Sequence, residues 1–388
     1  MEWVTGLYWF DLAGVPWEWL LTGFFCAVVL VQLFYFWFYY SRVAFFKKTT
    51  EDETDAPIPV SIIISARNEY PALHENLPLI LNQDHPDFEV VVVNERSTDD
   101  SEMLLKELQK QYDNLKVVDL RYSVSFLKGK KLPISVGIKS ASHDHLILTD
   151  AGCHPAGDQW IQNMTRHLRG DKTIVLGYSS YEQQAGIMNK IIRLDNLYDG
   201  LQYLGFALAG RPYKGDGRNL SYSRSLFYAV KGFTAHYKIP AGDDDLFVNH
   251  AATNKNTAVE FSPEAHTVAS PPDTFSGWLK QKRQRSITYR YYKEKDKRRI
   301  SLFRVSGLLF YPLFIVALVL AGLSIPGYVV AGSFLLRMIS LFTIINSAAK
   351  TLKEPKISLF SLAGDVMLSV VYMMLFVTSV FTKKTTWK

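Results

Sequence analysis

The sequence predicts an α/β domain with a doubly wound sheet, joined to transmembrane α-helices. Three observations predict this fold class. Charged residues are nearly absent from long apolar runs near both ends of the chain. Between these runs, short β-branched segments alternate with helical patterns. The chain has 388 residues, which allows one large or two ordinary domains with a full core.

Charge and cysteine usage narrow the class of protein. The formal net charge is +6, from 43 Lys and Arg against 37 Asp and Glu. Basic residues gather beside the apolar runs, as in Lys293–Arg299, which favours attraction to anionic lipid over nucleic-acid binding. Cys26 and Cys153 lie in unlike contexts, so a disulfide framework has no support. We therefore expect the soluble part to face a reducing compartment.

The first apolar run, Trp19–Ser41, exceeds the roughly 20 residues that cross a bilayer. Aromatic residues near both of its ends suit the membrane interface. Acidic Glu2 and Asp11 precede the run and no basic segment opens it, which disfavours a signal peptide. With Arg42 following, the amino terminus is expected outside and residue 42 onward inside.

The run Val305–Leu336 is too long for one crossing, and Ser324–Gly327 interrupts it. It predicts two helices joined by a tight turn, followed by a third from about Leu359 to Phe381. Four crossings from an outside start would leave Lys383 and Lys384, with Lys388, outside. Either the positive-inside tendency is overridden, or one apolar element lies in the interface.

Two charged residues fall within the carboxyl-terminal apolar region. Arg337 and Asp365 lie near the expected membrane–water boundary. They either pair or line a polar path, or they are helix-end residues that reach toward the headgroups.

The soluble middle follows the acidic linker Glu51–Pro59. We expect strands at Val60–Ser65, Phe88–Val93, Leu115–Leu120 and His145–Thr149. Helical patterns occupy Asn76–Leu81, Asp99–Leu108 and Lys131–Ala141. The predicted domains are an amino-terminal membrane helix at 1–48, the soluble domain at 49–300, and carboxyl-terminal membrane helices at 301–388.

Ligands of doubly wound sheets bind beyond the carboxyl ends of the strands. Residues 66–69, 94–99 and 150–154 are therefore the candidate binding segments. Residues 94–99 offer hydrogen-bonding groups for a base or ribose, although Ser97, Thr98 and Asp99 are also helix-capping types. Asp150 either meets a divalent cation held by a diphosphate or is a turn residue.

Three further segments carry chemistry-bearing side chains. Asp243–Asp245 crowds three carboxylates, which suits a general base or else marks a solvated helix start. The basic segment Trp278–Arg285 suits either lipid headgroups or a diphosphate leaving group. Gly215–Tyr222 is like a binding loop, but two glycines do not make a nucleotide fingerprint.

In this order, the segments resemble membrane-bound, processive-type family 2 glycosyltransferases, a group that includes cellulose, chitin and hyaluronan synthases and bacterial envelope enzymes. The resemblance covers about Pro59–Arg285. Val60–Glu69 resembles the opening strand and nucleotide-gripping turn of the family. Val92–Asp99 resembles its second acidic motif. The resemblance implies nucleotide-sugar contacts for Ala66, Arg67, Glu69, Glu95, Lys131 and Asp150.

The chain departs from the family pattern at the expected metal motif. Thr149–Cys153 stands where the family has Asp-X-Asp, and Gly152 replaces the second aspartate. The resemblance implies Mg²⁺ or Mn²⁺. Asp150 would bind the ion, with His154 as a candidate substitute for the missing second aspartate.

Two later motifs imply catalytic and leaving-group roles. Gly242–Asn249 resembles the stretch with the catalytic base, which implies Asp244 as the base with Asp243 beside it. Gln281–Ser286 resembles Gln-X-X-Arg-Trp imperfectly, because Gln284 and Ser286 stand where Arg and Trp are expected. Gln281 with Arg283 or Arg285 is thus implied to bind the acceptor or the diphosphate.

The resemblance implies an inverting glycosyltransferase with a GT-A-like fold on the cytoplasmic face of a bacterial inner membrane. It would use a UDP- or GDP-sugar donor and a membrane lipid or glycan acceptor, and no nucleic acid. The alternative is a catalytically impaired membrane scaffold that binds nucleotide sugar or a partner subunit, which Gly152 and the altered Gln-X-X-Arg region favour. A transporter is disfavoured because few apolar segments accompany a large soluble domain.

Overall fold

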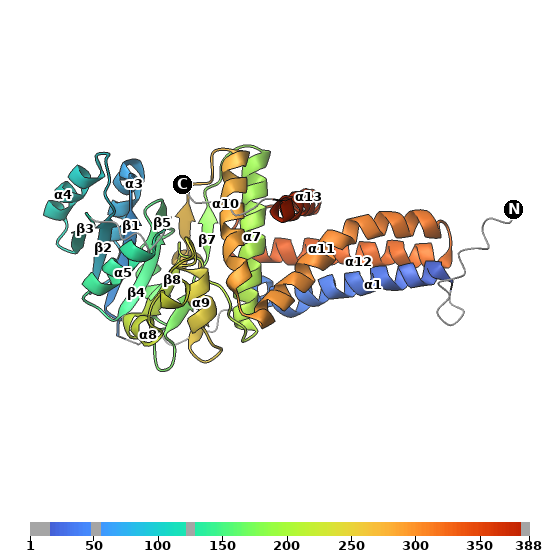
Figure 1. Cartoon of the computed structure of the whole chain (residues 1–388), viewed down its shortest axis with the longest axis horizontal. Coiled ribbons are helices and arrows are strands. Elements are labelled where there is room, and N and C mark those ends of the chain that lie inside the picture. The colour runs from blue at the N-terminus through green and yellow to red at the C-terminus, as the bar shows by residue number, and fades with distance from the viewer. Residues whose placement is uncertain (1–15, 48–55, 122–128, 382–388) are drawn as a thin grey trace.

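The computed structural model describes residues 16–47, 56–121 and 129–381. Its two parts lie end to end, with a sheet-containing domain at one end and a helical bundle at the other (Figure 1). Helices α7 (Ile187–Leu208) and α10 (Phe275–Thr288) stand between the two parts. Lys383, Lys384 and Lys388 lie outside the described residues.

A mixed sheet of seven strands forms the centre of the domain, in the order β3-β2-β1-β4-β8-β6-β9. Strands β1 to β4 are parallel, and β8 runs antiparallel to both β4 and β6. Strands β5, β10 and β7 form a second, smaller sheet. The bounds of the seven strands are β1 Val60–Ala66, β2 Phe88–Asn94, β3 Leu115–Asp119, β4 His145–Asp150, β6 Ile174–Leu176, β8 Leu220–Ser223 and β9 Thr257–Val259. Those of the smaller sheet are β5 Cys153–Pro155, β7 Ser179–Tyr181 and β10 Thr267–Ala269.

Helices cover the sheet and connect its strands. The connecting helices are α3 Tyr70–Leu81, α4 Ser101–Gln111, α5 Lys131–Ser140, α6 Trp160–Thr165, α8 Arg224–Ala229 and α9 Asp245–Ala251. Strands β1 and β2 are almost wholly buried, as their continuous β-branched runs require. The α/β sheet with membrane-type helices that the sequence predicts is therefore confirmed.

Three helices are long and apolar enough to cross a membrane in the described part of the chain: Trp17–Ala44, Glu294–Ala321 and Ile325–Thr351. The first combines α1 (Trp17–Phe34), a π-helical stretch at Tyr35–Tyr40 and α2 (Ser41–Ala44). The second and third are α11 and α12, which meet at the predicted turn near Ser324. Aromatic rings pack between them, with Phe314 and Phe334 stacked at 3.9 Å between centroids.

The fourth apolar helix, α13 (Phe360–Phe381), takes a different direction. Figure 1 shows α1, α11 and α12 running together away from the sheet, whereas α13 lies across their base and points toward the viewer. Gly364 packs against Leu194 of α7, and Tyr198 of α7 donates a hydrogen bond to Asp365 at 2.8 Å. Tyr372, about two turns further on, hydrogen-bonds Asp195 of α7. Helix α13 is therefore anchored to the soluble domain through α7 as well as to the bundle through α12.

Arg337 and Asp365 form a buried ion pair, with 2.6 Å between Nη1 and Oδ2. The first of the two alternatives predicted for these residues is therefore the one observed. The pair ties α12 to α13, and Gln32 of α1 accepts a further hydrogen bond from Arg337 at 3.4 Å. A charge pair that is satisfied in this way is tolerated away from water.

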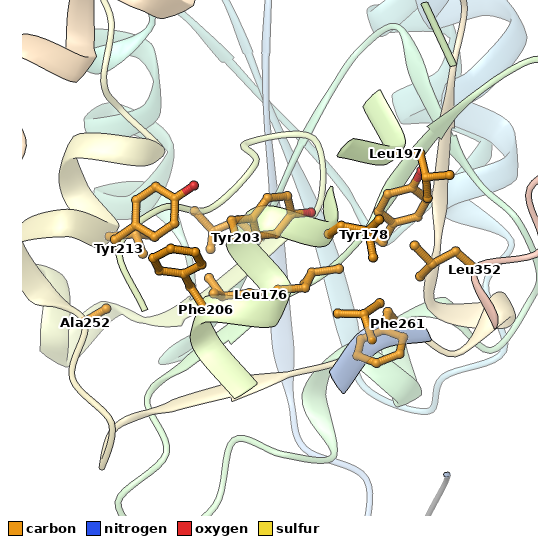
Figure 2. Packing of buried hydrophobic residues seen from close by; sticks show 14 of the residues in the cluster. Leu176, Tyr178, Leu197, Tyr203, Phe206, Tyr213, Ala252, Phe261 and Leu352 are labelled. Atoms are coloured by element: carbon orange, nitrogen blue, oxygen red, sulfur yellow. The ribbon is translucent and has the colours of Figure 1, made fainter. Parts of the chain in front are cut away.

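One hydrophobic cluster joins the soluble domain to the bundle (Figure 2). Leu176 and Tyr178 at the end of β6 pack in it with Tyr203 and Phe206 of α7, and Leu352 reaches it from the end of α12. Tyr178 also donates a hydrogen bond to buried Glu354 at 2.8 Å. This continuous packing fixes the orientation of the domain on the membrane helices.

Candidate active site

The carboxyl ends of three parallel strands lie at one edge of the large sheet. Ala66 at the end of β1 pairs with Asn94 at the end of β2, and Ser65 pairs with Asp150 at the end of β4. The residues that follow these strands are thus neighbours in space. The rule for ligand sites in α/β sheets places a binding site here.

The turns after β1 and β2 are joined by hydrogen bonds. The backbone N–H of Asn68 donates to Ser97 Oγ at 3.0 Å, and that of Thr98 donates to Asn68 Oδ1 at 2.7 Å. Asp99 accepts from the N–H of Tyr70 at 3.0 Å. Ser97 and Asp99 therefore hold the two turns together, whereas the residue at the N-cap of α4 is Asp100.

The other residues predicted to bind the nucleotide from these turns, Ala66, Arg67 and Glu95, differ in exposure and contacts. Ala66 is buried, and its carbonyl oxygen accepts from the N–H of Glu95 at 2.8 Å. Arg67 is exposed. The Glu95 carboxylate lies 3.7 Å from Arg96, and the Glu95 side chain is half-buried.

An ion pair occupies the end of β4. The ammonium of Lys130, just before α5, donates to Asp150 Oδ1 at 2.6 Å, and the two side chains stay 47% and 36% exposed. Glu69 belongs to the same group of charges, because burial and the Asp150 carboxylate raise its pKa while Lys130 opposes the rise. The pair is thus accessible to a ligand.

Lys131, which the sequence predicted to hold the nucleotide, has a different position. Its side chain is fully buried, and its ammonium donates to the carbonyl oxygens of His236, Ile239 and Ala241 at 2.6–2.8 Å. An ammonium has three donors, so none is left for a ligand. Burial lowers the pKa of Lys131 to about 8, against the effect of nearby carboxylates. Lys130 is the lysine that faces the strand ends.

The contacts of Lys131 fix the loop that carries the acidic run. Gly129 reinforces them: its φ is +70°, and an added Cβ would lie 1.9 Å from the carbonyl oxygen of Pro240. Gly242 has φ of +95°, which is strained for residues other than glycine. Residues 129–131 and 239–242 are therefore locked together, which brings Asp243 toward the end of β4.

The three aspartates of the run have distinct partners. Asp244 Oδ2 accepts from the N–H of Gly217 at 3.0 Å, and its Oδ1 accepts from the N–H of Asp245 at 2.6 Å. Asp245 is buried and accepts from Tyr292 at 2.7 Å. Burial and the Asp244 carboxylate raise the pKa of Asp245 to about 6.

Asp243 connects the acidic run to the end of β4. Burial, then the charges of Asp244 and Asp150, raise the pKa of Asp243 to about 7, while Lys130 opposes the rise. In turn, desolvation acts to lower the pKa of Lys130, but the Asp150 and Asp243 carboxylates outweigh it and the pKa is raised. Asp150 and the acidic run, about ninety residues apart in the chain, thus share one electrostatic site.

The three residues of α10 that were expected to bind the acceptor or the diphosphate lie on two faces of the helix. Gln281 Oε1 accepts from Tyr181 at 3.3 Å. Arg285, one turn further, has a raised pKa because the Asp216 carboxylate outweighs the effect of its burial. Arg283 instead is exposed and lies among apolar residues of α10 and α13. Of the two arginines left open by the sequence, Arg285 lies near Asp216, in the loop that holds Asp244.

The loop before β8 contributes groups that the sequence analysis did not assign. Its Gly217 N–H holds Asp244, and Arg218 forms a buried pair with Asp216 at 2.6 Å. Thr149, next to Asp150, donates to the Arg218 carbonyl oxygen at 2.9 Å. The Gly-Asp-Gly-Arg pattern in the sequence was the signal for this loop, and the structure places it beside Asp244.

Comparison with known proteins agrees with this geometry. Residues 61–234 match the family model described as Glycosyl transferase family 2. These residues form a family 2 glycosyltransferase domain. The large sheet up to β8, including Asp150 and the Gly217 loop, falls within it, whereas Asp243–Asp245 follow its end.

Individual relatives of the family 2 domain are distant. The probable glycosyltransferase YdaM of Bacillus subtilis is 23% identical over 233 residues, which are 58% of this chain and 53% of YdaM. A poly-beta-1,6-N-acetyl-D-glucosamine synthase of Staphylococcus epidermidis is 28% identical over 92 residues, which are 24% of this chain and 21% of the synthase. The chain thus spans about half or less of the length of these curated relatives.

A solved structure confirms the GT-A-like fold. The mannosyltransferase PcManGT of Pyrobaculum calidifontis, solved with GDP-Man and Mn²⁺, is 18% identical and has a TM-score of 0.57. The match covers 86% of this chain and 99% of that chain.

The residues of this family 2 domain fit a metal poorly. Across the described ranges, no three His, Cys, Asp or Glu side chains gather as metal ligands. Asp150 is already paired with Lys130, and Gly152 supplies no second carboxylate. His154 sits on β5, in register with Val268 of β10. A divalent cation prefers several oxygen ligands, and within the expected metal motif Asp150 alone supplies a carboxylate.

Proposed function

We propose that this protein is an inverting glycosyltransferase that moves a sugar from a UDP- or GDP-sugar to a membrane lipid or glycan. The observation that carries the proposal is the meeting of Asp150, Lys130 and the Asp243–Asp245 run beyond the carboxyl ends of the parallel strands. The family 2 domain supports the reaction class. Glu69 and Glu95, with Ala66 and Arg67, would bind the nucleotide side of the donor.

Asp244 is proposed as the general base. Two backbone N–H groups fix its carboxylate, so its orientation does not depend on substrate. It takes the proton of the acceptor hydroxyl while that oxygen forms a bond to the anomeric carbon. The bond from that carbon to the diphosphate oxygen breaks, and its electron pair leaves with the nucleoside diphosphate. Attack from the opposite face inverts the anomeric configuration.

The leaving diphosphate gains negative charge, which Lys130 and Arg285 would offset. Lys130 is already at the end of β4, and Arg285 of α10 lies near Asp216, in the loop that holds Asp244. No step of this mechanism passes through a metal ion. Asp243, with its pKa near neutrality, would hold or release a proton beside the base.

The test is a panel of radiolabelled nucleotide sugars incubated with membranes that contain the protein, followed by extraction into organic solvent. Asp244→Asn should reduce transfer by about 10²- to 10⁴-fold while donor binding persists. The matched control is Asp113→Asn, an exposed position outside the site, which should transfer normally. Near-normal transfer by Asp244→Asn would remove this residue from the mechanism, and no labelled product with any donor would favour the scaffold alternative.

We also propose that the soluble domain faces the cytoplasm of a bacterial inner membrane, with three crossings and α13 in the interface. Helix α13 exposes Val366, Val370, Met373 and Met374, which lie on one face at helical spacing. Its opposite face contacts α7. An in-plane helix with one apolar face suits the headgroup boundary. Three crossings from an outside start also remove the conflict with the positive-inside tendency.

A further inference from the structure

We propose that the Lys130 ammonium supplies, at Asp150, the positive charge for the donor diphosphate, so that donor binding does not require a divalent metal ion. This inference rests on the proposed glycosyltransferase function. Its basis is the ion pair in which the Lys130 ammonium lies 2.6 Å from Asp150 Oδ1. Asp150 is the one carboxylate left in the expected metal motif.

The ammonium is available to a ligand. It has three donors, and among the described residues its hydrogen-bonding partner is Asp150. Nearly half of the Lys130 side chain is exposed, in contrast to fully buried Lys131. Two donors therefore remain for phosphate oxygens, and lysine binds phosphate as a point charge.

The position of Lys130 is set by its neighbours. Gly129 is in close contact with the Pro240 carbonyl, and Lys131 is held by three carbonyl oxygens of residues 236–241. Because both flanking residues are anchored, the backbone of Lys130 is fixed beside the end of β4. The charge is thus pre-organised, as a binding group must be if it is to act without reorganisation.

The same arrangement disfavours a metal ion. A divalent cation on Asp150 would lie about 2 Å from a carboxylate oxygen and would repel the ammonium already there. The second carboxylate that would outweigh this repulsion is missing at Gly152. A Cβ built at Gly152 meets no atom within 4 Å, so the site has room for an aspartate. Crowding therefore does not explain why this position carries glycine and no carboxylate.

The experiment measures binding of UDP and GDP to the purified full-length protein by titration calorimetry, in EDTA and in Mn²⁺. The unmodified protein should bind at least one nucleotide with a Kd that changes less than about threefold between the two conditions. Lys130→Met should weaken binding in EDTA by about tenfold or more, and Lys130→Arg should keep most of it. Circular dichroism and the unfolding temperature check that each variant is folded.

Gly152→Asp provides the matched gain-of-function arm. Combined with Lys130→Met, it should restore binding in Mn²⁺ but not in EDTA, because two carboxylates then face an unoccupied cation position. The inference is overturned if the unmodified protein binds nucleotide only in Mn²⁺, or if Lys130→Met binds like the unmodified protein in EDTA. If the unmodified protein binds neither nucleotide in either condition, the proposed function itself fails.

Discussion

Removal of the Asp243 carboxylate should stabilise the protein at alkaline pH. Burial and the Asp244 charge raise the pKa of Asp243 from 3.8 to about 7, so the folded state disfavours its ionised form. Below pH ~4 this carboxyl is protonated in both the folded and the unfolded state, so the raised pKa costs no stability. As the pH rises from there through about 7, the unfavourable ionised form lowers the free energy of unfolding. Asp243→Asn removes the charge, so its benefit should grow over this range and level off near pH 8.

The magnitude follows from the same pKa. Moving it from 3.8 to about 7 corresponds to at most about 4 kcal/mol for the ionised group. Lys130 offsets part of the repulsion and Asp243 is partly open to solvent, so we expect about 1–2 kcal/mol at pH 8. For a domain of this size, that is an increase in unfolding temperature of roughly 2–6 °C.

The assay is thermal unfolding of the detergent-solubilised protein at pH 5 and pH 8. Asp243→Asn should raise the unfolding temperature at both, and more at pH 8. Asp113→Asn, at an exposed position, should change neither value. An unchanged or lower unfolding temperature for Asp243→Asn at pH 8 would refute the view that this carboxylate is destabilised by its surroundings.

Two further predictions concern the loop contacts and the membrane. Gly129→Ala should abolish transfer, because the added Cβ would lie 1.9 Å from the Pro240 carbonyl oxygen. The control is Gly170→Ala, which has φ of +57° but open space around it, so it should cost only about 1 kcal/mol of stability and retain transfer. A comparable loss of transfer in both variants would point to backbone strain alone. A nitroxide attached at Met373→Cys should report headgroup depth by oxygen and nickel accessibility in nanodiscs, and a value typical of the bilayer centre would contradict the in-plane placement of α13.

Much of the fold was predictable because its parallel strands are buried on both faces. Such strands read as continuous β-branched runs, and β1, β2 and β4 were found within a residue or two of their ends. Strands β6 and β8 were not predicted. Strand β6 is apolar but only three residues long, and β8 has four residues of which Ser221 and Ser223 are polar, so neither gives an apolar run long enough to mark a strand.

The candidate site was predictable where its residues follow a strand. It was less predictable where the direction of a side chain depends on its angular position around a helix. Asp150 and the acidic run were predicted from strand ends and charge crowding, and the structure brings them near one another. Lys130 and Lys131 are adjacent at a helix start, where one residue turns a side chain by about 100°. The sequence could not show which of them turns inward, nor that residues 236–241 would supply the carbonyl groups that capture Lys131.

Helix α10 links the chemistry to the membrane surface. Gln281 accepts a hydrogen bond from Tyr181, and Arg285, four residues further on, lies near Asp216. Arg283 lies on the other side with Leu279, against Met374 of α13. One short helix thus contacts both Tyr181 and a helix that we place in the headgroup region. An acceptor that approaches Asp244 along α10 would come from the bilayer, which favours a lipid-linked acceptor over a soluble one.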